Sequence, residues 1–461
     1  MKQTSRDTVI SSSFRDPSGF VFCRDGIIYR QVNTVYKEQY DNLNGGLYEA
    51  LVNAGLLVSH EEVTIESIEP DRAYKIIKPE KIPFISYPYE WCFSQLKDAA
   101  LATLTIHKKA IEFGMALKDS SAYNIQFIKG KPVFIDTLSF DKYNKNRPWV
   151  AYRQFCQHFL APLALMSCRD IRLNQLFRVY LDGIPLDLAS SLLPLRTRFQ
   201  FSLVSHIHLH AKSQKHFGQK AVKMSDYQMG NLAHLGLIDN LETAVKKLKV
   251  HKQDTEWANY YEETNYSSES MQHKQQLVEE LLDTIQPNVV WDLGANIGMF
   301  SRIAAKKGIR TISFDIDPAA VEKNYLQCIE EGERNILPLI IDLANPSPPI
   351  GWEHKERMSL MERGPAELVF ALALIHHLAI SNNLPFYKIA GFIKKICKSL
   401  IIEFIPKHDS QVQRLLANRE DIFFDYTQQN FEHEFGKYFT ICSAERIKDS
   451  ERTLYLMDVK Q

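Results

Sequence analysis

The second half of the chain alternates short apolar runs with longer segments whose apolar residues recur at helical spacing. The apolar runs, which predict strands, lie at 289–293, 310–314, 336–341, 367–373 and 399–404. The helical patterns lie at 268–285, 298–307 and 318–331. Strands that alternate with helices predict a mostly parallel sheet with right-handed crossovers. Two last apolar runs, at 438–447 and 453–459, flank a polar turn and predict an antiparallel hairpin at one edge of the sheet.

The first half of the chain has a less regular pattern. Two β-rich runs within 19–33 flank Asp25-Gly26, a pair typical of a hairpin turn. Apolar residues recur at helical spacing over 48–57 and 90–115, and a mainly helical pattern spans 151–219. We therefore expect three parts: an α+β accessory domain at 1–215, a connector at 216–255, and an α/β domain at 256–461.

Composition and charge narrow the class of protein. The 461 residues, 45% of them hydrophobic and 24% charged, fit a soluble globular enzyme of two or three domains. Lys and Arg together number 55, as do Asp and Glu, so no positive field attracts a phosphate backbone and we expect no nucleic-acid partner. Seven scattered cysteines without a Cys-x-x-Cys pair predict reduced thiols in the cytoplasm. We expect no signal peptide, because residues 1–15 are polar, and no membrane span, because no stretch reaches about 18 consecutive apolar residues.

The turn after the run 289–293 carries the most informative chemistry. It contains Asp292, Gly294, Asn296 and Gly298 and leads from a predicted strand into a predicted helix, the arrangement of a nucleotide cradle. The glycine spacing differs from the Gly-x-Gly-x-x-Gly of dinucleotide sites. A carboxylate at the strand end would repel a pyrophosphate but attract a ligand with an ammonium and a sulfonium group. S-adenosylmethionine is such a ligand, and we expect these four residues to bind it.

Two more acids follow the next predicted strands. Asp315 ends the second strand, where a carboxylate accepts hydrogen bonds from both ribose hydroxyls. Asp342 ends the third strand, where it would accept a hydrogen bond from the adenine amino group. Asp317 precedes Pro318 at a helix start, so we expect it to cap that helix instead. The three strand-end acids, Asp292 included, therefore predict one cofactor site at a shared edge of the sheet.

As a set, these residues resemble the class I S-adenosylmethionine-dependent methyltransferases, whose first motif reads like Val-x-Asp-x-Gly-x-x-x-Gly and whose second strand ends in an acid. The resemblance covers roughly residues 257–461. It implies a Rossmann-like, seven-stranded sheet whose last strand is antiparallel, with methyl transfer to an oxygen or nitrogen atom. With the segments 402–407 and 411–416, the chain is also similar to bacterial nodulation-type host-specificity methyltransferases. That similarity implies a small-molecule or carbohydrate acceptor and leaves a protein acceptor open.

The exit of the fourth predicted strand carries His376 and His377. The segment is similar to the Leu-His-His of several small-molecule methyltransferases and lacks the Asn/Asp-Pro-Pro-Tyr of enzymes that methylate the amino groups of nucleic acid bases or of glutamine. An imidazole with an ordinary pKa of about 6.5 suits proton removal near neutral pH. Either histidine is therefore a candidate catalytic base, and structural packing is the alternative for each.

Two further groups of residues invite a functional interpretation. His206, His208 and His210 would line one face of a strand as metal ligands, but no acid or cysteine accompanies them and we expect no metal. A second group precedes the first predicted strand, where a lid over the cofactor forms in the methyltransferase family; core packing is the simpler role. Its members are Trp257, Tyr260, Tyr261 and Tyr266.

A rival interpretation concerns the accessory domain. Asp119, then Asn124, then Asp136 after an apolar run resemble the catalytic loop and metal-binding acid of protein-kinase-like phosphotransferases. The resemblance implies that Asp119 orients an acceptor hydroxyl while Asn124 and Asp136 hold magnesium. No glycine-rich phosphate loop precedes them, and Arg30 stands where a phosphate-pairing lysine would be wanted. A kinase-like phosphotransferase and a non-catalytic S-adenosylmethionine-binding protein are the two alternatives to a methyltransferase.

Overall fold

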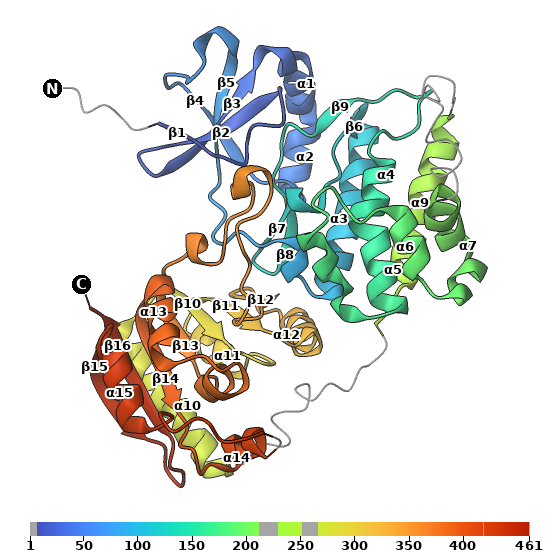
Figure 1. Ribbon diagram of the computed structural model, residues 1–461. Coiled ribbons are helices and arrows are strands. Elements are labelled where there is room, and N and C mark those ends of the chain that lie inside the picture. Colours follow the sequence, from blue (N-terminus) through green and yellow to red (C-terminus); the bar gives the residue numbers. More distant parts are fainter. Residues whose placement is uncertain (1–6, 212–228, 251–265, 418, 461) are drawn as a thin grey trace, which may run out of the picture. The chain divides into compact units, whose positions relative to one another are not determined.

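The computed structural model describes residues 7–211, 229–250, 266–417 and 419–460. The chain forms two compact units, which Figure 1 colours from blue to red along the sequence. The first unit comprises Met1–Lys252 together with the short segment Ile350–Arg357, and the second comprises Gln253–Pro349 and Met358–Gln461. Among the described residues, every helix is too short or too polar to cross a lipid bilayer.

The second unit is built on a seven-stranded sheet of order β12-β11-β10-β13-β14-β16-β15. Only β16 is antiparallel to its neighbours on either side, so the predicted parallel sheet with a terminal hairpin is confirmed. The strands are β10 (Val289–Leu293), β11 (Arg310–Asp315), β12 (Ile336–Ile340), β13 (Ala366–Ala371), β14 (Cys397–Phe404), β15 (Phe439–Arg446) and β16 (Thr453–Val459). The helices are α10 (Ser268–Ile285), α11 (Met299–Lys306), α12 (Pro318–Glu331), α13 (Phe386–Ile396), α14 (Ser410–Leu416) and α15 (Gln428–Gly436).

The period-two alternation of the strands decides which side chains meet which helices. Leu454 and Leu456 of β16 are buried in one apolar cluster with Val278 of α10 and Phe300 of α11. The residue between them, Tyr455, faces the other side, where its ring centroid lies 5.2 Å from that of Phe431 in α15. Helices α10 and α11 therefore cover one face of the sheet and α15 covers the opposite face (Figure 1).

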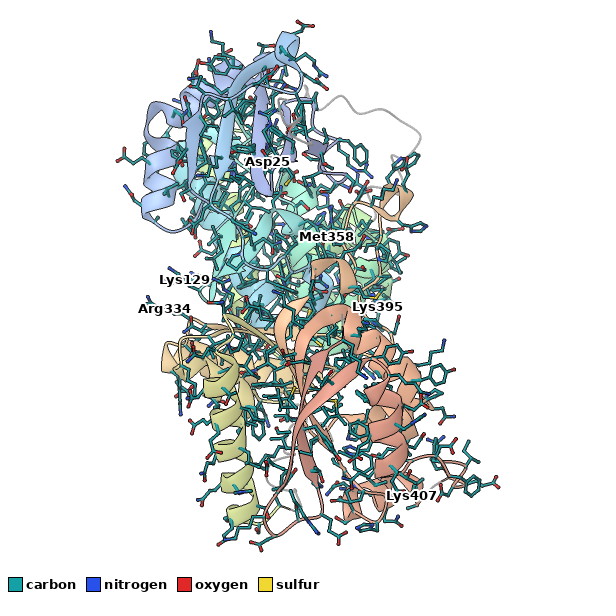
Figure 2. The ribbon with its side chains drawn as sticks, turned by 90° about the vertical axis from the view of Figure 1, so that its left-hand side faces the viewer. Asp25, Lys129, Arg334, Met358, Lys395 and Lys407 are labelled. Atoms are coloured by element: carbon teal, nitrogen blue, oxygen red, sulfur yellow. The ribbon has the colours of Figure 1, made fainter. Side chains whose placement is uncertain are left out.

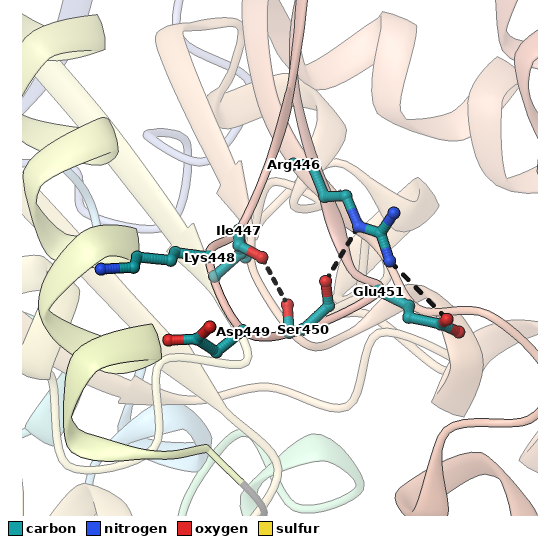
Figure 3. Close-up of a pocket in the computed structure, with 6 residues that line it drawn as sticks. All are labelled: Arg446, Ile447, Lys448, Asp449, Ser450 and Glu451. Carbon is teal, nitrogen blue, oxygen red and sulfur yellow. Dashed lines mark hydrogen bonds and ion pairs between the residues drawn. The ribbon is translucent and has the colours of Figure 1, made fainter.

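The turn between β15 and β16 is closed by its own polar groups. Arg446 Nε donates to the Ser450 carbonyl oxygen at 3.0 Å, and Ser450 Oγ donates to the Ile447 carbonyl oxygen at 3.0 Å (Figure 3). The open hollow along residues 446–451 is lined by this turn alone. The hollow therefore reflects the shape of the hairpin, and the strand-end acids have no part in it.

The first unit begins with a five-stranded antiparallel sheet of order β1-β2-β3-β5-β4. The hairpin predicted within 19–33 is confirmed, because Asp25 and Gly26 turn with φ of 52° and 78° between β2 and β3. Asp25 is labelled in Figure 2, as is Lys129, whose φ of 51° begins the similar turn between β7 (Ile125–Ile128) and β8 (Lys131–Phe134). The first five strands are β1 (Thr8–Val9), β2 (Gly19–Arg24), β3 (Ile27–Asn33), β4 (His60–Val63) and β5 (Ala73–Pro79).

Helices and two small hairpins complete the first unit. The pattern over 90–115 forms one long helix, α3 (Phe93–Glu112). The described part of the expected connector contains α9 (Asn231–Lys247), which packs on α3 within the first unit. The other helices are α1 (Lys37–Asn42), α2 (Tyr48–Asn53), α4 (Tyr152–Phe155), α5 (Ala161–Cys168), α6 (Leu186–Leu192) and α7 (Phe201–Leu203). The remaining strands are β6 (Met115–Leu117), β7 (Ile125–Ile128), β8 (Lys131–Phe134) and β9 (Phe140–Lys142).

The segment Ile350–Arg357 is fixed in the first unit by charged groups that the sequence pattern did not single out. Glu356, whose side chain is 5% exposed, forms an ion pair with Arg15, in which Arg15 Nη2 lies 2.6 Å from Glu356 Oε1. The Arg357 guanidinium lies 4.3 Å from the centroid of the Tyr123 ring, a cation–π distance. The polypeptide therefore leaves the second unit after β12, contributes to the first unit and returns before β13.

Candidate cofactor site

The turn between β10 and α11 is fastened to the end of the neighbouring strand. The backbone N–H groups of Gly294 and Ala295 both donate to the Phe314 carbonyl oxygen of β11, each at 2.9 Å. Gly294 has a φ of +73°, and a Cβ there would lie 3.2 Å from Cδ1 of Leu374. Positive φ and this close approach both favour glycine. The turn is thus a preformed cradle between two parallel strands.

Asp315 is held in a fixed orientation at the end of β11. Its Oδ2 accepts from the backbone N–H of Asn296 at 2.7 Å, and its Oδ1 accepts from the backbone N–H of Asp317 at 2.9 Å. Burial raises the pKa of Asp315 to about 6, although these two amide donors act in the opposite direction. Each carboxylate oxygen has lone pairs left, so the group can still accept hydrogen bonds from a ligand.

Asp292 lies one strand away on the face covered by α10 and α11. Its Oδ2 accepts from the Ser301 hydroxyl of α11 at 2.6 Å. Burial raises the pKa of Asp292 to about 6, and the nearby charge of Asp315 contributes, while the Ser301 hydrogen bond lowers it. A buried carboxylate of this kind is stabilised in its ionised form by a cationic ligand.

The other residues expected at this site follow the same strand ends. Asn296 is buried and takes a φ of +51°, a conformation that asparagine tolerates better than most residues. Asp342 follows β12, and its Oδ1 accepts from the backbone N–H of Ala344 at 2.8 Å. Asp317 caps α12 by accepting from the Ala319 N–H at 2.9 Å, as predicted. The Ile341 N–H donates to the Asp315 carbonyl oxygen, which ties the second and third strand ends together.

His376 and His377 lie after β13, with ring centroids 4.1 Å apart. The His376 side chain is 1% exposed, and its Nδ1 has no hydrogen-bond partner among the described residues. Burial lowers the pKa of His376 well below the ordinary value, and His377, Arg452 and Lys274 lower it further. Burial lowers the pKa of His377 to about 4. Both imidazoles are therefore neutral at physiological pH, and Nδ1 of His376 can still form a hydrogen bond with a ligand.

A buried charge network, which sequence reasoning missed, lies beside these histidines. Glu403, at the end of β14, accepts from Lys274 Nζ at 2.7 Å and from the backbone N–H of Ala373 at 2.8 Å. Its other oxygen accepts from the Tyr266 hydroxyl. Arg452 Nη1 lies 3.7 Å from that second oxygen. Lys274 and Arg452 outweigh burial and lower the pKa of Glu403, so the carboxylate is ionised. The network orients the loop that carries the two histidines.

Two members of this network had a signal in the sequence. Lys274 stands within the apolar stripe of the helix 268–285, between Met271 and Val278, where a surface lysine is not expected. Glu403 interrupts the otherwise apolar end of the run 399–404. The partners are 129 residues apart, so their pairing could not be read from spacing.

The remaining residues of interest in the sequence do not join the site. His206 and His208 lie in the helical segment Val204–His208, where alternation does not put side chains on one face. His206 contacts the Tyr152 hydroxyl at 2.7 Å and His208 contacts the Ser190 hydroxyl at 2.8 Å. The described residues contain no group of histidines, cysteines and acids that could hold a metal ion. Trp257, Tyr260 and Tyr261 lie outside the described residues, and Tyr266 belongs to the buried network.

The first unit brings Asp119, Asn124 and Asp136 close together. The Asp119 side chain accepts from the Ser121 N–H at 2.9 Å. Burial raises the pKa of Asp119, and the charge of Asp136 raises it further. Burial alone would raise the pKa of Asp136, but Arg30 and a hydrogen bond from Ser139 lower it. Arg30 Nη1 lies 2.5 Å from Asp136 Oδ1 and Ser139 Oγ lies 2.5 Å from Oδ2. Asn124 Nδ2 lies 3.5 Å from Ser139 Oγ. Both oxygens of Asp136 therefore have partners from the chain itself.

The sheet order with one antiparallel strand, and the glycine turn between two strands that end in acids, define the class I methyltransferase fold. The chain belongs to the same family as the nodulation protein NoeA of Rhizobium meliloti (strain 1021). The two are 34% identical over 458 residues, which cover 97% of this chain and 96% of that protein. This match confirms the resemblance to the nodulation group, and the sheet order confirms the fold that the resemblance to class I methyltransferases implies. No family model matches the chain.

Solved structures are similar to parts of the chain at lower identity. Magnesium protoporphyrin IX methyltransferase of Synechocystis PCC 6803, crystallised with SAH, is 16% identical, covers 44% of this chain and 92% of that one, and has a TM-score of 0.32. The bifunctional kinase-methyltransferase WbdD is 13% identical, covers 41% of this chain and 39% of that one, and has a TM-score of 0.28.

Proposed function

We propose that the chain is a methyltransferase that uses S-adenosylmethionine and methylates an oxygen or nitrogen atom of a small-molecule, carbohydrate or protein acceptor. The observation that carries this proposal is Asp315, a buried strand-end carboxylate whose two oxygens are oriented by backbone amides beside a glycine turn. The resemblance to nodulation-type methyltransferases favours a carbohydrate among the acceptors, and the 34% identity to the nodulation protein NoeA supports that resemblance. Seven free thiols support the expected cytoplasmic location.

The residues around the turn fit the cofactor group by group. Asp315 would accept hydrogen bonds from the two ribose hydroxyls, and Asp342, at the next strand end, would accept a hydrogen bond from the adenine amino group. Asp292 would attract the ammonium and sulfonium charges from the face covered by α10 and α11. Gly294 would let the backbone approach the ligand, with Leu374 covering the turn. The cofactor supplies a methyl group on a sulfonium that is already a good leaving group.

The chain itself has to align the acceptor and exclude water. His376 supplies a buried Nδ1 that has no hydrogen-bond partner in the part of the chain that the structure describes, so it would hydrogen-bond the hydroxyl or amine of the acceptor. Its lowered pKa keeps the imidazole neutral, and as a weak base it would hold the proton only while the methyl group is transferred. Glu403 fixes the loop through the Ala373 N–H and so sets where His376 stands.

Turnover tests this proposal directly. The full chain is incubated with S-adenosylmethionine and, in turn, oligosaccharide, small-molecule and protein acceptors, and S-adenosylhomocysteine is measured. We expect product with one acceptor class, and a loss of about 100-fold or more in His376→Ala, because general acid–base groups contribute about 10²–10⁴-fold. His433→Ala, at a side chain that is 69% exposed, is the matched control. Cofactor binding without turnover on any acceptor would instead favour a non-catalytic binding protein.

Phosphoryl transfer by the first unit is the second candidate, because Asp119, Asn124 and Asp136 come together there. Magnesium prefers carboxylate oxygens, and in this structure Asp136 already gives its two oxygens to Arg30 and Ser139. A titration with Mg-ATP decides between the two functions. Firm binding that is lost in Asp136→Ala would favour the phosphotransferase, whereas no binding in wild type and in Arg30→Ala would exclude it.

A further inference from the structure

A short segment of the first unit presents large apolar side chains to solvent. Phe199, Phe201 and Leu195 are 91%, 76% and 70% exposed. They belong to a 3₁₀ helix and to the start of α7, which follows it (Figure 1). Thr197, in the same 3₁₀ helix, is buried, and its hydroxyl lies 3.0 Å from Nε2 of His208. The exposed side chains are therefore carried on a turn that is anchored from its inner side.

Arginines are interleaved with these apolar side chains. Arg196 and Arg198 are both exposed and alternate with the apolar residues along the 3₁₀ helix. In the part of the chain that the structure describes, no carboxylate pairs with either guanidinium. The sequence from Leu188 to Ala211 contains no Asp or Glu, although the chain as a whole has a formal net charge of zero. The segment therefore combines apolar surface with a local excess of positive charge.

Hydrogen bonds connect this segment to further basic residues. Arg196 Nη2 donates at 3.1 Å to the carbonyl oxygen of Cys168, the residue before the exposed Arg169. Ser167 Oγ donates at 2.6 Å to the carbonyl oxygen of Lys249, which is also exposed. These contacts bring positive charges from three parts of the chain onto one surface of the first unit. The members of this basic patch are Arg169, Arg196, Arg198 and Lys249.

An anionic lipid surface matches this combination better than a protein partner does. Aromatic and aliphatic side chains enter the boundary between lipid headgroups and acyl chains, while Lys and Arg are attracted by the negative surface potential. A side chain as exposed as Phe199 protrudes from the fold, so a folded partner would have to supply a matching pocket. A fluid bilayer closes around such a side chain without a preformed pocket.

We propose that the segment 195–201, together with the basic patch, binds the surface of a bilayer that contains anionic lipids. Leu195, Phe199 and Phe201 enter the interface, and the basic patch pairs with lipid phosphates. This attachment is peripheral, because the segment lies on the surface of a folded unit. It does not depend on the proposed function, since neither cofactor nor acceptor takes part.

Flotation of the full chain with lipid vesicles tests the proposal. The vesicles contain phosphatidylcholine alone or a mixture of phosphatidylcholine and phosphatidylglycerol. We expect wild type to bind the anionic vesicles, and to bind them less at high salt because exposed charges are screened. Partitioning should fall about 10- to 100-fold in Phe199→Ser/Phe201→Ser, which removes apolar insertion, and about 10- to 30-fold in Arg196→Gln/Arg198→Gln.

A matched control separates this patch from apolar exposure in general. Phe424 of the second unit is 81% exposed, but Asp421 and Asp425 lie close to it in the sequence, so Phe424→Ser should bind anionic vesicles as wild type does. All substituted side chains are exposed, and the thermal unfolding of each variant should match that of wild type.

Three outcomes would overturn the proposal: no flotation of wild type with anionic vesicles, equal flotation with neutral ones, or full binding by a folded Phe199→Ser/Phe201→Ser. Light scattering of the same proteins identifies the other occupant. A wild-type dimer that is lost in this double variant, without vesicle binding, would show that a second copy of the chain covers the segment instead.

Discussion

At the scale of single residues, the site depends on two carboxyl groups whose pKa is raised by burial. Asp292 and Asp315 both have a pKa raised to about 6, chiefly by burial. Both folded-state values lie above the ordinary value of 3.8, so the folded protein keeps protons that the unfolded chain has released between about pH 4 and 6. The contribution of these acids to stability therefore falls as the pH rises through that window. A cationic ligand offsets this loss by favouring the ionised forms.

Cofactor affinity should consequently depend on pH. If one acid with a pKa of about 6 must ionise for binding, the affinity for S-adenosylmethionine at pH 5 is about tenfold weaker than at pH 7 or 8. Calorimetric titration between pH 5 and 8 measures this. Asp315→Asn should bind more weakly throughout and show a shallower dependence on pH. An affinity that is constant over this range would contradict the role of the two acids.

Gly298 is the residue at which backbone conformation and packing can be separated. Gly298 and Gly308 have nearly equal φ, +80° and +79°. A Cβ at Gly298 would lie 2.6 Å from the Asn324 side chain, whereas one at Gly308 would meet nothing within 4 Å. We expect Gly308→Ala to lower the free energy of unfolding by about 1–2 kcal/mol and Gly298→Ala to lower it by clearly more, as urea unfolding would measure. Equal decreases in the free energy of unfolding would show that the Asn324 side chain moves away from the added methyl group without cost.

At the scale of elements, the strands and helices of the second unit follow closely from the sequence. The helix predicted at 318–331 has those bounds, and the strand ends carrying Asp292 and Asp315 were found because parallel strands share one edge. The network around Glu403 could not be found this way, because it joins residues that are distant along the chain. A charge within an apolar stripe indicates burial but does not name its partner.

The ion pair between Arg452 and Asp409 should be among the costliest to break. Arg452 is 2% exposed and Asp409 11%, and Asp409→Asn keeps the size of the side chain while leaving the buried guanidinium without that charge. We expect the free energy of unfolding to fall by about 3–5 kcal/mol. Asp421→Asn breaks an exposed pair with Lys407, which solvent screens, and should leave the free energy of unfolding nearly unchanged. Chemical denaturation measures the free energy of unfolding of both variants. A similar decrease in the two would show that the buried pair stabilises the fold no more than the exposed one.

At the scale of the whole molecule, the division into units is only partly visible in the sequence. The change from an irregular pattern to alternating strands and helices indicates where the α/β part begins. Nothing in the pattern indicates that Ile350–Arg357 belongs to the first unit, because that assignment depends on single contacts such as Glu356 with Arg15. The kinase-like interpretation of the first unit stays a prediction, and Arg30 at Asp136 is the contact that any nucleotide-bound metal would have to displace.

The most direct test of the central claim is calorimetric titration of wild type and Asp315→Ala with S-adenosylmethionine. Asp315 joins the glycine turn to the end of β11, and its removal should leave the sheet folded while deleting the ribose acceptor. We expect wild type to bind one equivalent and Asp315→Ala to bind at least about tenfold more weakly, since hydrogen bonds to a charged group contribute about 1.5–3 kcal/mol. Absence of binding by wild type, or equal affinity in a folded Asp315→Ala, would contradict the assignment of this site.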